Sequence, residues 1–183
     1  NNLSKYYDTI MSLPLHSSDN KQRVERIINY YNEKSTIIKN ISLLDVGSGL
    51  CVFLSEIKKH IDDVTCIDPS IKAIKHAKDY VGISNTIHGN FDDVAIDKKY
   101  DLITFNKVLE HVKNPVELLI KAKSLLNHDG YIYIELPDGD CAAKNGGFVD
   151  REEFFIEHYT IFNIPSVKFL AKSAKLSCAV LNA

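Results

Sequence analysis

The sequence lacks the segments that mark membrane and secreted proteins. No apolar run approaches the roughly 20 residues that a membrane-spanning helix needs. No signal-peptide pattern opens the chain either. Neither sign of charge is in excess, since the formal net charge is −2 at pH 7, so long-range attraction to nucleic acid or to an anionic membrane is not expected. These absences predict a cytoplasmic protein with no nucleic-acid or membrane partner.

Paired cysteines are missing as well. Cys51, Cys66, Cys141 and Cys178 are scattered and form no C-x-x-C pair, and the seven histidines do not cluster with them at the spacing of a metal site. We therefore expect reduced thiols and no metal. The chain also lacks internal repeats and low-complexity stretches, and 183 residues is an ordinary size for one domain. The sequence thus predicts a single domain over 1–183.

What the sequence does contain is a short apolar run, 43–46, that reaches an acidic residue and then passes through Gly47 and Gly49. Glycines let the backbone turn tightly and leave no Cβ between the main chain and a bound molecule. A helical pattern follows, and the first N–H groups of a helix point back toward such a turn. This strand-turn-helix pattern predicts a site for a nucleotide cofactor.

The details of the turn favour a cationic cofactor that carries a ribose. A dinucleotide fingerprint would need a third glycine where Val52 stands, and Asp45 would repel a pyrophosphate. A nicotinamide-dependent oxidoreductase is therefore the weaker alternative. Asp68 closes the next apolar run, 64–67, roughly 20 residues past the glycines, which is the spacing of a carboxylate that binds ribose hydroxyls.

Strand-like and helix-like patterns alternate along the chain. From Asn20 the pattern is helical, with apolar residues from Val24 to Tyr31, and Asp19 or Asn20 is the expected cap. The pattern predicts an α/β fold, a Rossmann-like doubly wound and mostly parallel sheet of about six to seven strands with helices on both faces. The expected strands lie near 43–46, 64–67, 85–88 (an edge strand), 102–105 (central), 131–136 and 176–181, and the expected helices near 51–60, from 71, 115–126 and 165–173.

Four ordered motifs resemble those of the class I S-adenosylmethionine-dependent methyltransferases. They are Asp45-Val46-Gly47-Ser48-Gly49, the acid at Asp68, the segment 89–92, and the segment 101–106 followed by 108–112. The resemblance covers about residues 40–180 and implies S-adenosyl-L-methionine as the cofactor. This family ordinarily adds an antiparallel strand after the sixth, which we do not find before Ala183.

The resemblance also implies roles for individual residues. Asp45 would meet the amino group of the cofactor and Asp68 would hold the ribose. The adenine edge would lie at Asn90 and Phe91, and Asn106 would flank the sulfonium. The full set of cofactor-binding residues expected in this way is Asp45, Gly47, Ser48, Gly49, Leu50, Cys51, Asp68, Pro69, Ser70, Asn90, Phe91, Asp92, Asn106, Lys107 and Val108.

On the acceptor side, His111 and His158 are the candidate catalytic bases, because neutral imidazole is suited to removing a proton from a hydroxyl. We expect transfer of a methyl group to a small polar metabolite, such as a sugar or a phosphorylated compound. A binding subunit without activity is the alternative.

The expected parts of the chain are an N-terminal helix and lid (1–40), a cofactor-binding core (41–136) and a substrate-side segment (137–183). Candidate substrate-binding residues are Tyr6, Tyr7, Arg23, Glu157 and Tyr159.

Overall fold

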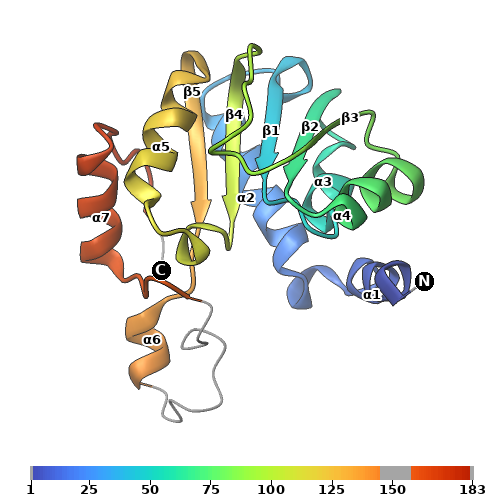
Figure 1. The fold of residues 1–183 in the computed structure, drawn as a ribbon, viewed down its shortest axis with the longest axis horizontal. Helices are drawn as coiled ribbons and strands as arrows, with labels where there is room; N and C mark the ends of the chain where they lie inside the picture. Colours follow the sequence, from blue (N-terminus) through green and yellow to red (C-terminus); the bar gives the residue numbers. More distant parts are fainter. Residues whose placement is uncertain (1, 145–157, 182–183) are drawn as a thin grey trace.

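The computed structural model describes residues 2–144 and 158–181, without the side chains of Asn2 and Ala142. Five parallel strands form one sheet in the order β3-β2-β1-β4-β5 (Figure 1). The predicted Rossmann-like architecture is therefore confirmed, with β3 at an edge and β4 in the interior as expected. The strands are β1 (Ser42–Val46), β2 (Asp63–Asp68), β3 (Asn85–His88), β4 (Tyr100–Asn106) and β5 (Leu126–Glu135).

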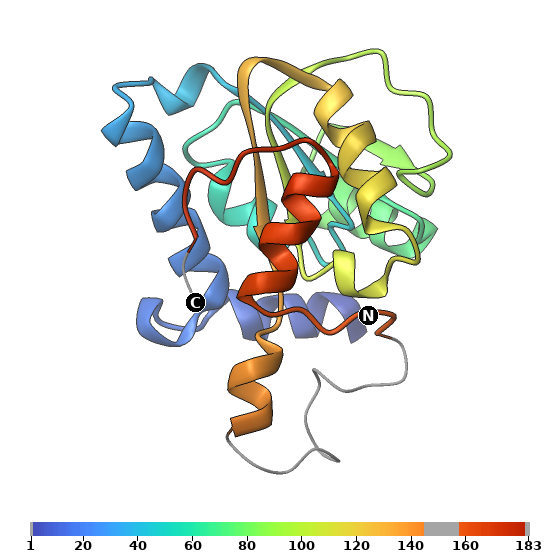
Figure 2. The same ribbon diagram turned by 90° about the vertical axis from the view of Figure 1, so that its left-hand side faces the viewer.

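Helices cover both faces of the sheet (Figures 1 and 2). They are α1 (Asn2–Met11), α2 (Asp19–Glu33), α3 (Val52–Ile57), α4 (Ile71–His76), α5 (Pro115–Ser124), α6 (Gly139–Lys144) and α7 (Ile164–Ser173), with short helical turns at η1 (Leu15–Ser17), η2 (Ile38–Asn40), η3 (Ala77–Val81) and η4 (Leu109–His111). The helix predicted to run to residue 126 ends at Ser124, because β5 begins two residues later.

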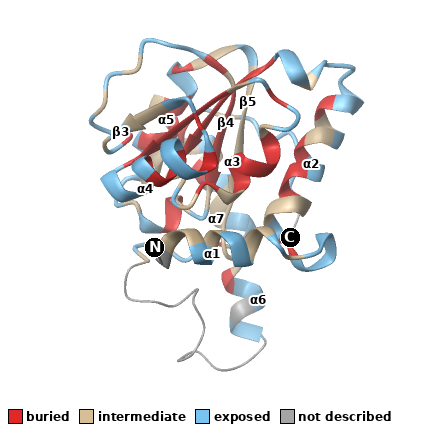
Figure 3. Cartoon of the chain, turned by 90° about the vertical axis from the view of Figure 1, so that its right-hand side faces the viewer, coloured by how far each residue is buried: buried red, intermediate tan, exposed pale blue. Residues whose placement is uncertain are grey.

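Successive residues of each strand pack against opposite layers. Leu43 and Leu102 belong to the hydrophobic cluster formed with α2, α3 and α4. Leu44 and Ile103 belong to the second cluster, formed with α5 and α7. Each of the four side chains is at most 2% exposed, and the strands and inner helix faces form the buried centre of the molecule in Figure 3. Burial on both faces explains why these strands carry apolar side chains on both faces.

Side-chain caps fix the starts of two helices that border the carboxyl edge of the sheet. Ser18 caps α2 by accepting a hydrogen bond from the backbone N–H of Lys21. The predicted cap at Asp19 or Asn20 was wrong by one residue, since the helix already includes Asp19. Asn163 and Ser166 form a reciprocal capping box at the start of α7.

The sixth strand predicted at 176–181 does not form, and the described residues contain five strands. Lys175 adopts the left-handed conformation, and the Leu176 N–H donates to the carbonyl of Ala171. This bond uses the backbone of Leu176 to close the last turn of α7, so it does not join the sheet. Leu176 instead contributes its side chain to the cluster beside α7, and Val180 is 58% exposed.

The strands all point toward one edge of the sheet, and α1 and α6 lie beyond that edge (Figures 1 and 2). Helix α1 is attached by Tyr7, whose ring makes edge contacts with His76 and Tyr80. The Tyr7 hydroxyl also forms a hydrogen bond of 2.5 Å with Ser55 Oγ on α3. Among the described residues, no helix combines the length and the apolar character that crossing a membrane requires.

Candidate functional site

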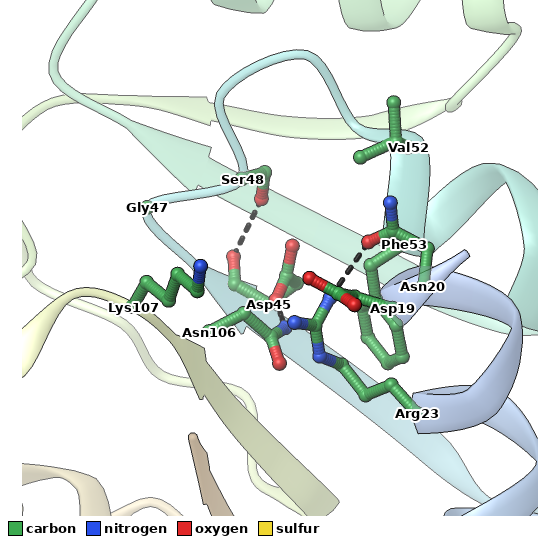
Figure 4. A pocket seen from close by; sticks show the side chains of 10 residues that line it. All are labelled: Asp19, Asn20, Arg23, Asp45, Gly47, Ser48, Val52, Phe53, Asn106 and Lys107. Atoms are coloured by element: carbon green, nitrogen blue, oxygen red, sulfur yellow. Dashed lines mark hydrogen bonds between the residues drawn. The ribbon is translucent and has the colours of Figure 1, made fainter. Parts of the chain in front are cut away.

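A cavity of about 220 Å³ lies at the carboxyl ends of β1 and β4, which is where open α/β sheets bind ligands. It combines the glycine turn after β1, the end of β4 and the start of α2 (Figure 4). Its walls are formed by Asp19, Asn20, Arg23, Asp45, Gly47, Ser48, Val52, Phe53, Asn106 and Lys107. Six of these ten are candidate residues from the sequence, brought together from three separate segments.

Asp45 and Asn106 face each other at the base of this cavity (Figure 4). The Asp45 carboxylate accepts hydrogen bonds from Thr104 Oγ1 at 2.6 Å and from Asn106 Nδ2 at 2.9 Å. Burial raises the pKa of Asp45 to about 6, although these hydrogen bonds and the charge of Arg23 act in the opposite direction. The side-chain oxygen of Asn106 is buried and has no hydrogen-bond partner among the described residues. The pair therefore offers oxygen acceptors to a cationic group.

The two glycines of the turn have different surroundings. Both have positive φ, +71° at Gly47 and +51° at Gly49. A Cβ at Gly47 would lie 2.8 Å from a methyl group of Val108, so a side chain there would disturb the packing of the turn against the segment after β4. A Cβ at Gly49 would meet no atom of residues 2–144 and 158–181 within 4 Å. At Gly49 an added methyl group therefore probes a ligand without a steric clash, although the positive φ still makes a side chain there unfavourable.

Asp68 organises the neighbouring turn. Its two carboxylate oxygens accept hydrogen bonds of 2.8 Å from the backbone N–H groups of Gly49 and Ser70. The side chain is 7% exposed. Each carboxylate oxygen has a second acceptor position, so the bonds to Gly49 and Ser70 leave capacity for ligand hydroxyls. Asp68 does not line the cavity itself, and it contacts the glycine turn from the β2 side.

Arg23 reaches the cavity from α2, but its guanidinium is already occupied. It forms a bidentate ion pair with Glu135 at the end of β5 and donates to Asn20 Oδ1 at 2.6 Å. Arg26 reaches the same carboxylate at 3.0 Å. Burial alone would raise the pKa of Glu135, but the hydrogen bond and charge of Arg23 hold that pKa below its usual value. Arg23 thus attaches α2 to the carboxyl edge of the sheet.

The two candidate histidines lie against each other beyond the end of β4. The His111 and His158 ring centroids are 4.6 Å apart in an edge-to-face arrangement. Glu110, which is 2% exposed, lies beside them. Burial raises the pKa of Glu110, against the opposing effects of its own backbone N–H and of the nearby His111, His158 and Lys107. The residues that the sequence offered as alternative bases therefore form one cluster.

The remaining candidates on the cofactor side lie around the cavity and not in its wall. Cys51 is buried in the left-handed conformation beside Cys66, and that neighbouring thiol together with burial raises the pKa of Cys51. Phe91 is buried with its ring edge-to-face against Phe105. Leu50 is half-buried, while Pro69, Ser70, Asn90 and Asp92 are exposed.

Candidates on the acceptor side are more dispersed. Tyr6 is 66% exposed on α1, while Tyr7 is held against α3 and α4. Tyr159 is 61% exposed, and its backbone N–H donates to the carbonyl of Glu110. Glu157 lies outside the described residues. The assignment of these residues to a substrate stays a prediction.

Sequence reasoning missed four residues of the cavity wall. Asp19 and Asn20 are expected from the sequence only as helix caps, and Phe53 falls within the helical pattern after the glycine turn with no predicted role in the site. Val52 had served only as evidence against a third glycine. For Val52 and Phe53, the signal available in the sequence was that both residues closely follow the glycines. Nothing in the local sequence indicates that the start of α2 folds back onto this edge.

Comparison with known proteins agrees with this geometry. The model of a methyltransferase domain family matches residues 17–177, which is most of the chain. The protein therefore belongs to this methyltransferase domain family.

Curated relatives include the ubiquinone biosynthesis O-methyltransferase of Glaesserella parasuis serovar 5, which is 28% identical over 116 residues, covering 57% of this chain and 49% of the relative. The mitochondrial ubiquinone biosynthesis O-methyltransferase of Schizosaccharomyces pombe is 23% identical over 122 residues, covering 63% of this chain and 44% of the relative. The chain thus spans about half the length of the curated relatives it matches.

Solved structures share the fold at low sequence identity. The plantazolicin methyltransferase BpumL, solved in complex with a pentazolic desmethylPZN analog and SAH, matches with a TM-score of 0.73 and 24% identity over 95% of this chain and 69% of that one. The sugar N-methyltransferase KedS8 from Streptoalloteichus sp. matches with a TM-score of 0.59 and 16% identity, over 68% and 51% of the two chains. At these identities the matches establish the fold alone.

Proposed function

We propose that the protein transfers a methyl group from S-adenosyl-L-methionine to a small molecule. The observation that carries this proposal is the pairing of the buried Asp45 carboxylate with the Asn106 oxygen, which has no partner within the described part of the chain, at the base of the cavity. A buried acceptor without a donor is costly, and a bound ammonium group relieves that cost. The methionine part of this cofactor carries such a group.

The other residues of the turn suit the rest of the cofactor. The open space at Gly49 allows the ligand to approach the backbone. Asp68 retains acceptor capacity for ribose hydroxyls, since charge-assisted hydrogen bonds to a carboxylate are strong. When bound, the cofactor supplies a methyl group that the positively charged sulfur has already activated. The chain then has to align the acceptor and exclude water.

For the acceptor we propose a small polar metabolite that is methylated on a hydroxyl. The support is the His111–His158 pair at the adjacent part of the carboxyl edge, because a hydroxyl must lose a proton and an imidazole pair can promote that loss. The relatives named as O-methyltransferases favour the same atom. A sugar derivative meets this description. A phosphorylated acceptor loses support, since Arg23 is committed to Glu135. A cytoplasmic location fits such an acceptor.

Two measurements test the proposal against its alternatives. Calorimetric titration should show saturable binding of S-adenosylhomocysteine and none of NAD, and preference for NAD would instead support an oxidoreductase. Incubation with methyl-labelled S-adenosylmethionine and a panel of hydroxyl and amine metabolites should then label a hydroxyl compound. Cofactor binding with no labelled product from any compound of the panel would favour the inactive binding subunit, and labelling of amines alone would overturn the choice of atom.

A further inference from the structure

Glu110, His111 and His158 together resemble a set of metal ligands. Each offers one ligand atom, and the three atoms lie within 4.8 Å of one another. Their backbones are also connected, because the N–H groups of Tyr159 and Thr160 donate to the Glu110 carbonyl at 2.7 and 3.3 Å. Two segments that are remote in the sequence are thus held together at the position of the cluster.

The carboxylate of Glu110 provides a second and independent observation. The residue is 2% exposed, and its Oε2 atom is buried without a hydrogen-bond partner among the described residues. An unsatisfied carboxylate oxygen in a buried position is energetically costly. A cation bound between this oxygen and the two imidazoles would remove the cost. His111 is exposed and His158 is half-buried, so an ion and a further ligand can reach the cluster from solvent.

We infer that Glu110, His111 and His158 bind a divalent transition-metal ion of the Zn²⁺ or Co²⁺ class. Two imidazoles and one carboxylate are the protein ligands of catalytic metal sites that keep a position open for water or substrate. Ligand atoms about 2.1 Å from a common ion lie no more than about 4.2 Å apart, so small side-chain rotations suffice to close the set. The positive charge of Lys107 also acts on the Glu110 carboxylate. Because it repels a second positive charge there, we expect an ion that is held weakly enough to exchange with solvent.

This inference rests on the proposed function and names the chemical class of the acceptor. A hydroxyl compound that coordinates the ion, such as a vicinal diol or a phenol with a neighbouring oxygen, loses its proton more easily than in water. The proton passes to solvent, and the oxygen forms a bond to the methyl carbon. The electron pair of the broken carbon–sulfur bond stays on sulfur, which becomes a neutral thioether. His111 and His158 then act as ligands of the ion and not as proton acceptors.

Metal binding is tested on the whole chain after removal of metals with a chelator, by titration with Co²⁺ followed by visible absorption and with Zn²⁺ followed by calorimetry. We expect one equivalent of either ion to bind. Each of E110Q, H111A and H158A should weaken binding at least about tenfold, since each removes one ligand. His128→Ala is the matched control, because His128 is exposed and remote from the cluster, and its affinity should equal that of the unaltered protein.

Absence of saturable binding in the unaltered protein would overturn the inference, as would retained binding in both E110Q and H158A. Thermal unfolding without metal shows whether each variant is folded, and H111A, with its exposed side chain, provides a surface variant if Glu110 proves essential to the fold. Titration of the same chelator-treated samples with S-adenosylhomocysteine separates the two proposals. In the unaltered protein, absence of Co²⁺ binding with normal cofactor binding contradicts the metal site alone, whereas absence of cofactor binding contradicts the proposed function.

Discussion

The turns after β1 and after β4 are neighbours at the same edge of the sheet, but they are built in different ways. The first turn consists of Gly47, Ser48 and Gly49, and the backbone N–H of Gly47 donates to the Ile67 carbonyl of the adjacent strand. The second contains Lys107, a non-glycine residue with φ of +55°, followed by the buried Glu110. Its backbone partners come from residues 135, 159 and 160. The first turn is thus held by the next strand of the chain, whereas the second depends on more distant segments that include the last part of the chain.

This difference gives the two turns separate functions at the carboxyl edge of the sheet. The glycine turn presents backbone groups and open space, which suits the parts of a cofactor that do not change during the reaction. The turn after β4 presents ionisable side chains, whose chemistry depends on what the last part of the chain brings to them. We expect substitutions in the first turn to affect cofactor affinity. Substitutions of Glu110 or His158, at and beside the second turn, should affect turnover with little effect on cofactor affinity.

The largest expected effect is on turnover through the second turn. His158→Ala should reduce the turnover of the labelled hydroxyl acceptor by about 10²–10⁴-fold, whether the histidine removes a proton or holds an ion. Affinity for S-adenosylhomocysteine, measured by calorimetry, should stay within a few-fold. His128→Ala serves as the control and should leave both quantities unchanged. If His158→Ala instead weakens cofactor binding as strongly as it slows turnover, the two turns do not have separate functions.

A second prediction concerns the attachment of α2 to the carboxyl edge of the sheet. The start of α2 forms the wall of the cavity that faces both turns. Arg23→Met should lower the free energy of unfolding by about 3 kcal/mol or more, because it leaves the half-buried Glu135 without its bidentate partner. The matched change Arg26→Met should cost only about 0–1 kcal/mol, since Arg26 is 43% exposed. Urea denaturation measures both values. Equal losses in the two variants would show that Arg23 does not anchor the helix.

Asp68→Ala should weaken binding of S-adenosylhomocysteine by at least about tenfold, through loss of charge-assisted hydrogen bonds worth about 1.5–3 kcal/mol each. Asp62→Ala, an exposed acid on the preceding loop, is the control. Because Asp68 also accepts from Gly49 and Ser70, the melting temperature should fall as well, and calorimetry has to be done well below it. Unchanged affinity would show that Asp68 does not bind the ribose.

A smaller effect follows from the titration of Asp45. Its pKa of about 6 means that the carboxyl is mostly protonated at pH 5 and mostly ionised at pH 7 in the ligand-free protein. A cationic ammonium group prefers the ionised form, so affinity for S-adenosylhomocysteine should rise by about tenfold from pH 5 to pH 7. Asp45→Asn should bind more weakly and show a flat profile. An equally steep profile in that variant would assign the titration to another group.

The same contrast explains how much could be predicted from sequence. The strands, the glycine turn and the acids that close β1 and β2 follow from hydrophobic runs and neighbouring residues, which act over short distances. The pairing of Arg23 with Glu135 and the contact of His111 with His158 join segments that only the tertiary fold brings together. The strand expected at 176–181 was wrong for a related reason, since Leu176 packs beside α7 while Val180 is exposed, and the run does not join the sheet.

The most direct test of the cofactor site compares two glycines that have the same backbone strain. Gly49 and Gly82 both have positive φ, and a Cβ at Gly82 would contact only the end of the Lys58 side chain. Replacing either by Ala should cost a similar amount of stability, about 1–2 kcal/mol. Calorimetry should show that Gly49→Ala weakens binding of S-adenosylhomocysteine at least tenfold, while Gly82→Ala binds as the unaltered protein does. Equal affinity in the two variants would contradict a cofactor beside the glycine turn.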